Sequence, residues 1–113
     1  MRARPATLAV CAALALASAT TVAGADEPSA TLLLQGHRFT PDRVEVPANA
    51  KVRLVIRNAD PTAEEFDSAQ LHREKVVPAG GEAVVYVGPL SPGAYAFMGE
   101  FHAETARGTL IAR

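Results

Sequence analysis

The run at residues 51–58 constrains the fold most strongly, because its apolar side chains recur at every second position. Val52, Leu54 and Ile56 fall on one side of an extended chain, and the residues between them, mostly Lys and Arg, fall on the other. Such alternation predicts a β-strand with one face on a core and the other largely in water.

Further short runs have the composition of strands, and they lie at residues 31–35, 44–46, 74–77, 82–87, 95–97 and 108–112. Turn-forming Pro, Gly and Asn separate them at intervals of roughly eight to twelve residues. Residues 59–70 show no two-residue period and predict a turn with one helical turn. About seven short strands with little helical periodicity favour an all-β fold, an antiparallel β-sandwich, in a single domain at residues 31–113.

The first 25 residues have the three parts of a secretory signal peptide. Two arginines open the segment, residues 6–19 are apolar, and an A-x-A cleavage signal ends at Ala25. The apolar run is shorter than the ~20 residues of a membrane span. We therefore expect cleavage after Ala25, a flexible leader at residues 26–30, and an exported product that does not itself span a membrane.

The cysteine count argues against thiol chemistry in the mature chain. Cys11 is the single cysteine of the 113 residues and lies within the expected signal peptide. A blue-copper electron-transfer centre requires a thiolate beside two imidazoles, so the mature chain is not expected to form one. The remaining nine basic and twelve acidic residues give a net charge of −3, which is unsuited to nucleic-acid binding.

Two loops combine carboxylates with histidine at a regular spacing. Glu65 and Asp67 are two residues apart, and so are Glu100 and His102. In extended chain each pair shares one face, and the phenylalanine between its members faces the opposite way, where it can be buried as an anchor. We expect the two pairs to converge at one end of the sandwich and to supply four ligands to one metal ion.

Other interpretations stay open for each of these side chains. Acidic loop residues are most often solvated, and a lone histidine is often a hydrogen-bonded structural residue. His37 is a third, isolated candidate ligand, and His72, beside Arg73, is a weaker one. Met98 continues a strand, so packing at the core or its rim is expected ahead of ligation. The sequence contains no organised Ser–His–Asp group and no phosphate-binding loop.

Several segments together resemble a known family. They are residues 39–41, 46–48, 58–60 and 74–77, with E-E-F-D-S at 64–68 and G-E-F-H-A-E-T-A-R-G at 99–108. In this combination the chain resembles the cupredoxin-like proteins of bacterial ferrous-iron uptake, which include EfeO-type domains and FtrB-type periplasmic subunits. Small blue-copper proteins carry Cys, His and Met ligands on the last loop, and the matching positions here are Met98, His102 and Ala106.

The resemblance implies a Greek-key sandwich in the periplasm. It also implies binding of copper or iron, and work beside an iron permease and other periplasmic or membrane subunits of the uptake system. By position, the implied metal ligands are Glu65, Asp67, Glu100 and His102, with His37 and Glu74 as looser correspondences.

The donor types support iron as well as copper. Carboxylates are hard ligands that favour ferric over ferrous iron, so a carboxylate-rich pocket with imidazoles makes iron easier to oxidise. We therefore expect a protein that binds ferrous iron, copper(II) or both, with ferroxidase-type assistance to iron oxidation as a further hypothesis. Two other interpretations stay open, namely a periplasmic copper carrier or copper-resistance protein, and a metal-free β-sandwich that bridges other proteins.

Overall fold

A computed structural model describes residues 2, 3, 5 and 27–113. The elements are β1 (Ser29–Gln35), β2 (Arg38–Thr40), β3 (Arg43–Val46), β4 (Val52–Asn58), β5 (Glu64–Ser68), β6 (Arg73–Val77), β7 (Glu82–Val87), β8 (Gly93–Gly99), the 3-10 helix η1 (Glu100–His102) and β9 (Arg107–Ala112). No helix within these residues has the length and apolar character needed to span a membrane.

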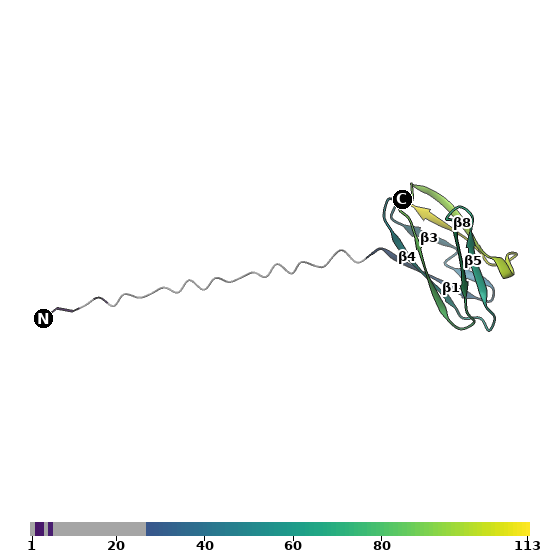
Figure 1. The fold of residues 1–113 in the computed structure, drawn as a ribbon, viewed down its shortest axis with the longest axis horizontal. Helices are drawn as coiled ribbons and strands as arrows, with labels where there is room; N and C mark the ends of the chain where they lie inside the picture. The colour runs from purple at the N-terminus through teal and green to yellow at the C-terminus, as the bar shows by residue number, and fades with distance from the viewer. Residues whose placement is uncertain (1, 4, 6–26) are drawn as a thin grey trace.

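The strands form two sheets that pack face to face (Figure 1). One sheet has the order β2-β1-β4-β7 and the other has the order β3-β9-β8-β5-β6. The predicted all-β sandwich is therefore confirmed. The expectation of antiparallel pairing throughout is wrong, because β1 pairs with β4 and β3 pairs with β9 in parallel. Parallel neighbours need a crossover connection, and the chain between β1 and β4 provides one by passing through β3 of the other sheet.

Seven of the strands lie where the sequence predicts them, and two more were not expected. β2 follows a two-residue turn after β1, within a segment that the sequence suggested was a break. β5 occupies Glu64–Ser68, so the predicted helical turn in this region is wrong. Its burial does alternate, but two of the three inward side chains, Glu64 and Ser68, are polar, which hides the two-residue period.

The core lies between the sheets and is centred on three aromatic rings. Phe97 contacts Phe39 edge-on at 5.1 Å between ring centroids, and its ring lies 5.3 Å from that of Phe66. Leu54 and Ile56 of β4 are fully buried against this group, as the alternation predicted. Each fully buried side chain of this size contributes about 1.5–3 kcal/mol to stability.

The N-terminal boundary differs slightly from the expected one. β1 begins at Ser29, so the last two residues of the expected flexible leader belong to a strand. The Pro28 carbonyl also accepts a hydrogen bond from the Arg53 N–H. Apart from residues 2, 3 and 5, the predicted signal peptide and its Cys11 lie outside the described residues.

Candidate metal centre

The C-terminal loop that carries His102 is closed on itself by backbone hydrogen bonds. β8 ends at Gly99, η1 follows directly, and β9 starts at Arg107. The Gly99 N–H donates to the Ala106 carbonyl at 2.8 Å, and the Ala106 N–H donates to the His102 carbonyl at 2.9 Å. Because both ends of the loop are tied, His102 has a fixed place at one end of the five-stranded sheet.

The buried carboxylate of Glu64 orients the His102 ring. Glu64 points inward from β5 and is 1% exposed. Its Oε2 lies 2.5 Å from His102 Nδ1, and its Oε1 accepts hydrogen bonds from the N–H groups of Glu65 and Phe101. A carboxylate on one ring nitrogen fixes the imidazole and leaves the other nitrogen for a metal ion. Within the described chain, His102 Nε2 has no hydrogen-bond partner.

Gly99 leaves the space that the Glu64 side chain occupies. A Cβ on Gly99 would lie 2.6 Å from Glu64 Cδ and 2.8 Å from Ala106 Cβ, so a larger residue would displace the carboxylate. Met98, the position matched to the blue-copper cysteine, lies opposite Asp67 on the outer face of the sheet. Ala106, matched to the methionine ligand, is fully buried in the core.

His37 lies beside His102 but belongs to the other sheet. It is the second residue of the two-residue turn between β1 and β2, and it follows Gly36 in a left-handed conformation, with φ of 55° against 60° for the glycine. Two consecutive positive φ values are the mark of a type I′ hairpin turn. The His37 ring stacks on the His102 ring, with centroids 3.5 Å apart and planes inclined by 10°.

Asp60 holds this turn through its carboxylate. Oδ1 accepts a hydrogen bond from the Gly36 N–H at 2.7 Å, and Oδ2 accepts one from the His37 N–H at 2.9 Å. The N–H of His37, followed by that of Gly36, holds the pKa of Asp60 below its usual range, although burial acts in the opposite direction. Asp60 itself is 7% exposed.

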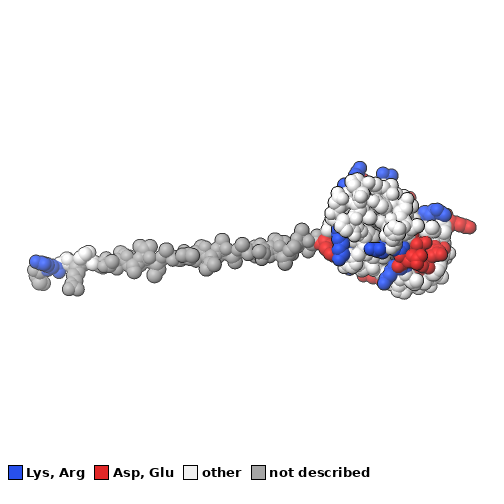
Figure 2. Space-filling view, turned by 45° about the horizontal axis from the view of Figure 1, so that its top comes forward, with Lys and Arg blue, Asp and Glu red and all other residues white. Residues whose placement is uncertain are grey.

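The four other predicted ligands are carboxylates, and they gather on the outer face of β5 and of the elements beside it. Asp67 lies opposite Glu74 on β6, and the charge of Glu100 acts on Glu65. Within the described residues none of the four forms an ion pair. Desolvation and the neighbouring carboxylates, Glu100 first among them, raise the pKa of Glu65. Figure 2 shows acidic side chains gathered on one face of the molecule, with basic side chains beside them.

The six predicted ligands therefore divide into two groups. His37 and His102 lie together with the inward-facing Glu64. The other four (Glu65, Asp67, Glu74 and Glu100) share the outer acidic face. In the part of the chain that the structure describes, no three His, Cys, Asp or Glu residues are arranged to hold one metal ion. The expected convergence of both pairs on one point is thus corrected, and a metal-binding role for these residues stays a prediction.

The two phenylalanines that separate the members of each predicted pair differ in burial. Phe66 is fully buried on β5, as expected for an anchor between Glu65 and Asp67. Phe101 is 53% exposed, so the expected second anchor is wrong. The reason is local, because Phe101 lies in a 3-10 helix rather than in extended chain, and the two-residue alternation does not apply there.

Sequence reasoning missed the residues that position the two imidazoles. In the sequence, Glu64 and Asp60 stand out only as parts of the segments that carry the family resemblance, at 64–68 and 58–60. The Glu64–His102 contact joins residues 38 positions apart, and the Asp60–His37 contact spans 23 positions. A hydrogen-bond partner so far along the chain leaves no local pattern, although the E-E-F-D-S segment that carries the resemblance does include Glu64.

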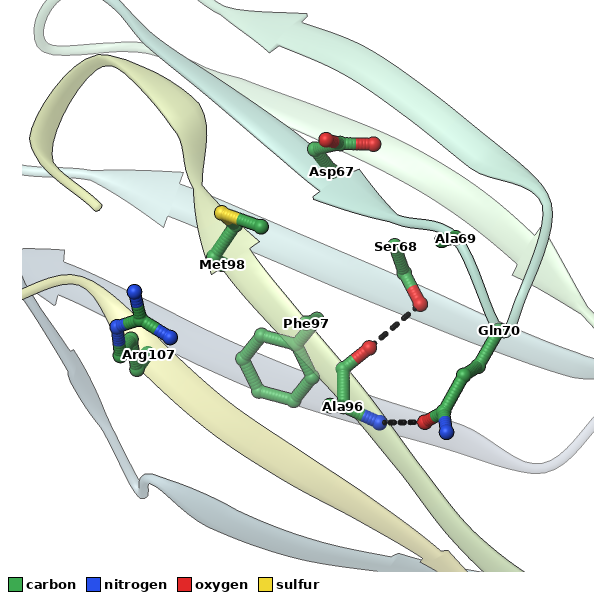
Figure 3. A pocket seen from close by; sticks show the side chains of 8 residues that line it. All are labelled: Asp67, Ser68, Ala69, Gln70, Ala96, Phe97, Met98 and Arg107. Atoms are coloured by element: carbon green, nitrogen blue, oxygen red, sulfur yellow. Dashed lines mark hydrogen bonds between the residues drawn. The ribbon is translucent and has the colours of Figure 1, made fainter.

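A separate hollow lies between β5 and β8 (Figure 3), and it contains no histidine. β5 diverges from β8 after Asp67, and side chains replace the missing strand pairing. Ser68 donates to the Ala96 carbonyl, and the Ala96 N–H donates to Gln70 Oε1. Met98 and Arg107 line the hollow, which has one carboxylate, that of Asp67. This donor set is poor for a cation, so the imidazole pair is the stronger candidate.

The donors at the imidazole pair fit copper(II) or iron by type. Imidazole nitrogen suits both metals, and a buried carboxylate beside it adds a negative charge. No cysteine occurs among the described residues, so they supply no thiolate for a blue-copper centre. His37 and His102 are the residues that would hold the ion, with Glu64 orienting His102.

A model of the cupredoxin-like domain family matches residues 6–112 of the chain. An uncharacterized protein of Rickettsia prowazekii (strain Madrid E) is 46% identical over 80 residues, which are 71% of this chain. The match spans 64% of the length of that relative.

The fold is also similar to those of several solved proteins. The metal-binding domain of a Cu(I)-exporting P-type ATPase of Streptococcus pneumoniae D39, determined with Cu(I), has a TM-score of 0.67 at 11% identity, over 75% of this chain and 84% of that domain. A purple cupredoxin from Nitrosopumilus maritimus has a TM-score of 0.59 at 17% identity, over 74% and 99%. Auracyanin B has a TM-score of 0.67 at 16% identity, over 80% and 92%.

Proposed function

This chain belongs to the cupredoxin-like domain family, and from that premise we propose that it is a metal-binding protein that holds copper or iron at His37 and His102. The observation that carries the proposal is that the His37 and His102 imidazoles lie side by side, with His102 held by the buried carboxylate of Glu64. In the stacked arrangement the ring planes are nearly parallel, so the rings must turn for a nitrogen of each to face one ion. Histidines that bind metal ions in proteins usually donate their second ring N–H to a carboxylate in this way.

We further propose that the protein acts in the periplasm as a component of a ferrous-iron uptake system, beside an iron permease. The residues behind this step are the E-E-F-D-S segment and the loop at 99–108, together with the outer acidic face, whose hard oxygen donors suit iron. When bound at His37 and His102, copper would supply a one-electron acceptor for Fe(II), with dioxygen of the medium as the final oxidant.

A copper carrier or copper-resistance protein is the second candidate. It is favoured by the similarity in fold to a domain determined with Cu(I), although a sequence identity of 11% supports a shared fold alone. Rates of Fe(II) oxidation in air, with the copper-loaded and the metal-free protein, distinguish the two. Faster oxidation by the loaded protein supports the iron role, and equal rates support the carrier.

Thermal unfolding with Cu(II), Fe(II) or Mn(II) tests metal binding itself. An ion at 100 times its dissociation constant stabilises the folded state by about 2.7 kcal/mol, a rise of roughly 10–20 °C in Tm for a domain of this size. The variants His37→Asn and His102→Asn should lose this rise. His72→Asn is the matched control, because His72 is exposed and has φ of 54°, close to the 55° of His37.

Three results would count against the proposal. No rise with any of the three metals contradicts metal binding, and an equal rise in all three variants contradicts the site. The loaded protein should also lack the intense visible absorption of a thiolate–copper centre, so its appearance would contradict the donor set.

A further inference from the structure

His37 occupies a left-handed backbone conformation, which is uncommon for residues other than glycine. The second position of a type I′ turn normally belongs to glycine, because a left-handed conformation costs other residues about 1–2 kcal/mol. His37 holds φ of 55° there. Strain of this kind persists only where the surrounding structure enforces it.

The enforcing contacts come from the loop after β4. Both oxygens of the Asp60 carboxylate accept hydrogen bonds from the turn, one from Gly36 and one from His37. Two hydrogen bonds from successive N–H groups to one carboxylate fix the orientation of the peptide between them. A charged acceptor also makes these bonds stronger than neutral ones.

Asp60 is itself held by a buried amide. The Asp60 N–H donates to Asn58 Oδ1 at 3.0 Å, and Asn58 Nδ2 donates to the Thr62 carbonyl at 2.8 Å and to the Val77 carbonyl at 3.3 Å. Asn58 is 2% exposed. The carboxylate therefore has little freedom to move, and its position is set by the end of β4 and its contact with β6 rather than by the turn.

We infer that Asp60, fixed by Asn58, is a positioning residue for the candidate metal centre. It holds the strained turn so that the His37 ring stays against the His102 ring before any ion arrives. The inference rests on the proposed metal binding at these histidines. Asp60 thereby prepares the site, since an ion then has to turn the rings but does not have to order the turn as well.

Cu²⁺ binding to Asp60→Ala, measured by competition titration at a temperature where the variant is folded, tests this. Loss of the carboxylate should weaken binding roughly 10–100-fold, the usual effect of removing a residue that orients a ligand. Asp42→Ala is the matched control, because Asp42 is exposed and its carboxylate has no hydrogen bond or ion pair within the described chain, and it should bind as the wild type does. If Asp60→Ala does not fold, Asp60→Asn keeps the size of the side chain and should show a smaller loss.

A second comparison, made in a variant that lacks the His37 ring, separates a positioning role of Asp60 from a general effect on the fold. His37→Gly relieves the strain and removes the ring, so adding Asp60→Ala to it should change Cu²⁺ affinity little further. The metal-free protein provides an independent readout, since the NMR signals of the His37 and His102 rings are shifted by stacking and should lose that shift in Asp60→Ala. Equal Cu²⁺ affinity of folded Asp60→Ala and wild type overturns the inference. Failure of the wild type to bind Cu²⁺ overturns the proposed function instead, while the ring signals still show whether Asp60 positions the pair.

Discussion

At the scale of single residues, the candidate metal centre depends on a polar side chain that points into the core. Glu64 faces the interior beside Phe66, and it is tolerated there because three groups bond to its two oxygens. A buried carboxylate without such partners would be strongly unfavourable. The size of residue 99 is part of the same arrangement, because the carboxylate lies against the bare Cα of that glycine.

The first prediction concerns Gly99→Ala. The added methyl group would meet Glu64 Cδ at 2.6 Å and Ala106 Cβ at 2.8 Å, so we expect unfolding in urea to show a loss of about 1–3 kcal/mol, the usual cost of overpacking. The His102 ring signals should also shift in NMR spectra as Glu64 is displaced. Gly93→Ala is the control, because its methyl group would lie 3.8 Å from the Tyr95 ring, an ordinary contact. Equal stability of the two variants would refute the crowding argument.

At the scale of elements, β5 has two faces with opposite roles. Its inward face supplies Glu64 to the imidazole pair, and its outward face supplies Glu65 and Asp67 to the acidic surface. The alternation of a strand therefore separates carboxylates that are adjacent in sequence onto opposite sides of a sheet.

The second prediction follows from the raised pKa of Glu65. The folded pKa lies above the ordinary value of 4.5, so the folded state binds the proton more tightly and ionised Glu65 opposes folding at neutral pH. Glu65→Gln should therefore unfold at a higher urea concentration than the wild type at neutral pH. The difference should shrink as the pH falls through the folded pKa and disappear below about pH 4, where both states are protonated.

The control for this change is Glu82→Gln. Glu82 is exposed and pairs with Arg57 at 3.2 Å, so its removal should give no gain in stability at neutral pH. A gain for Glu65→Gln that persisted unchanged at low pH would show that charge repulsion is not its cause.

The third prediction compares two phenylalanines on neighbouring elements. Phe97→Ala on β8 should lower the free energy of unfolding by about 3–5 kcal/mol, because its ring is 3% exposed and contacts both other core rings. Phe101→Ala in η1 should change it by less than about 0.5 kcal/mol, since that ring is mostly in solvent. Urea unfolding measures both, and a large loss for Phe101→Ala would contradict its exposed position.

At the scale of the whole molecule, the sandwich places residues from both sheets at one end. The β1–β2 turn belongs to the four-stranded sheet and η1 follows the five-stranded one, yet His37 and His102 are stacked. β1 lies inside its sheet, paired with β2 on one side and β4 on the other. The N-terminal strand is therefore part of what holds the site together.

The fourth prediction tests that dependence by truncation. A protein that begins at Asp26, the product expected after signal-peptide cleavage, should unfold cooperatively on heating. A protein that begins at Gly36 should not, because it lacks Leu32 and Leu34, which are 0% and 1% exposed, and leaves β2 without a partner and β4 paired with β7 alone. Circular dichroism during heating measures both, and a cooperative transition in the shorter protein would contradict an essential β1.

The sequence allowed the sandwich and most strand positions to be predicted, because alternation and turn residues are local signals. It also singled out His37 and His102, whose role as ligands stays a prediction. β4 was found from its alternating side chains alone. The pairing of Glu64 with His102 and of Asp60 with His37 could not be found in this way, since it depends on how the two sheets lie together. The parallel pairing of β1 with β4 was hidden for the same reason.

The stacked histidines come from different layers of the molecule, and this has a consequence for its lifetime. An ion bound by both imidazoles would link the two sheets, so the metal-loaded protein would unfold less often than the metal-free protein. Proteases that cut only opened chains would then remove the empty form first, and the pool that survives would be enriched in protein carrying its cargo.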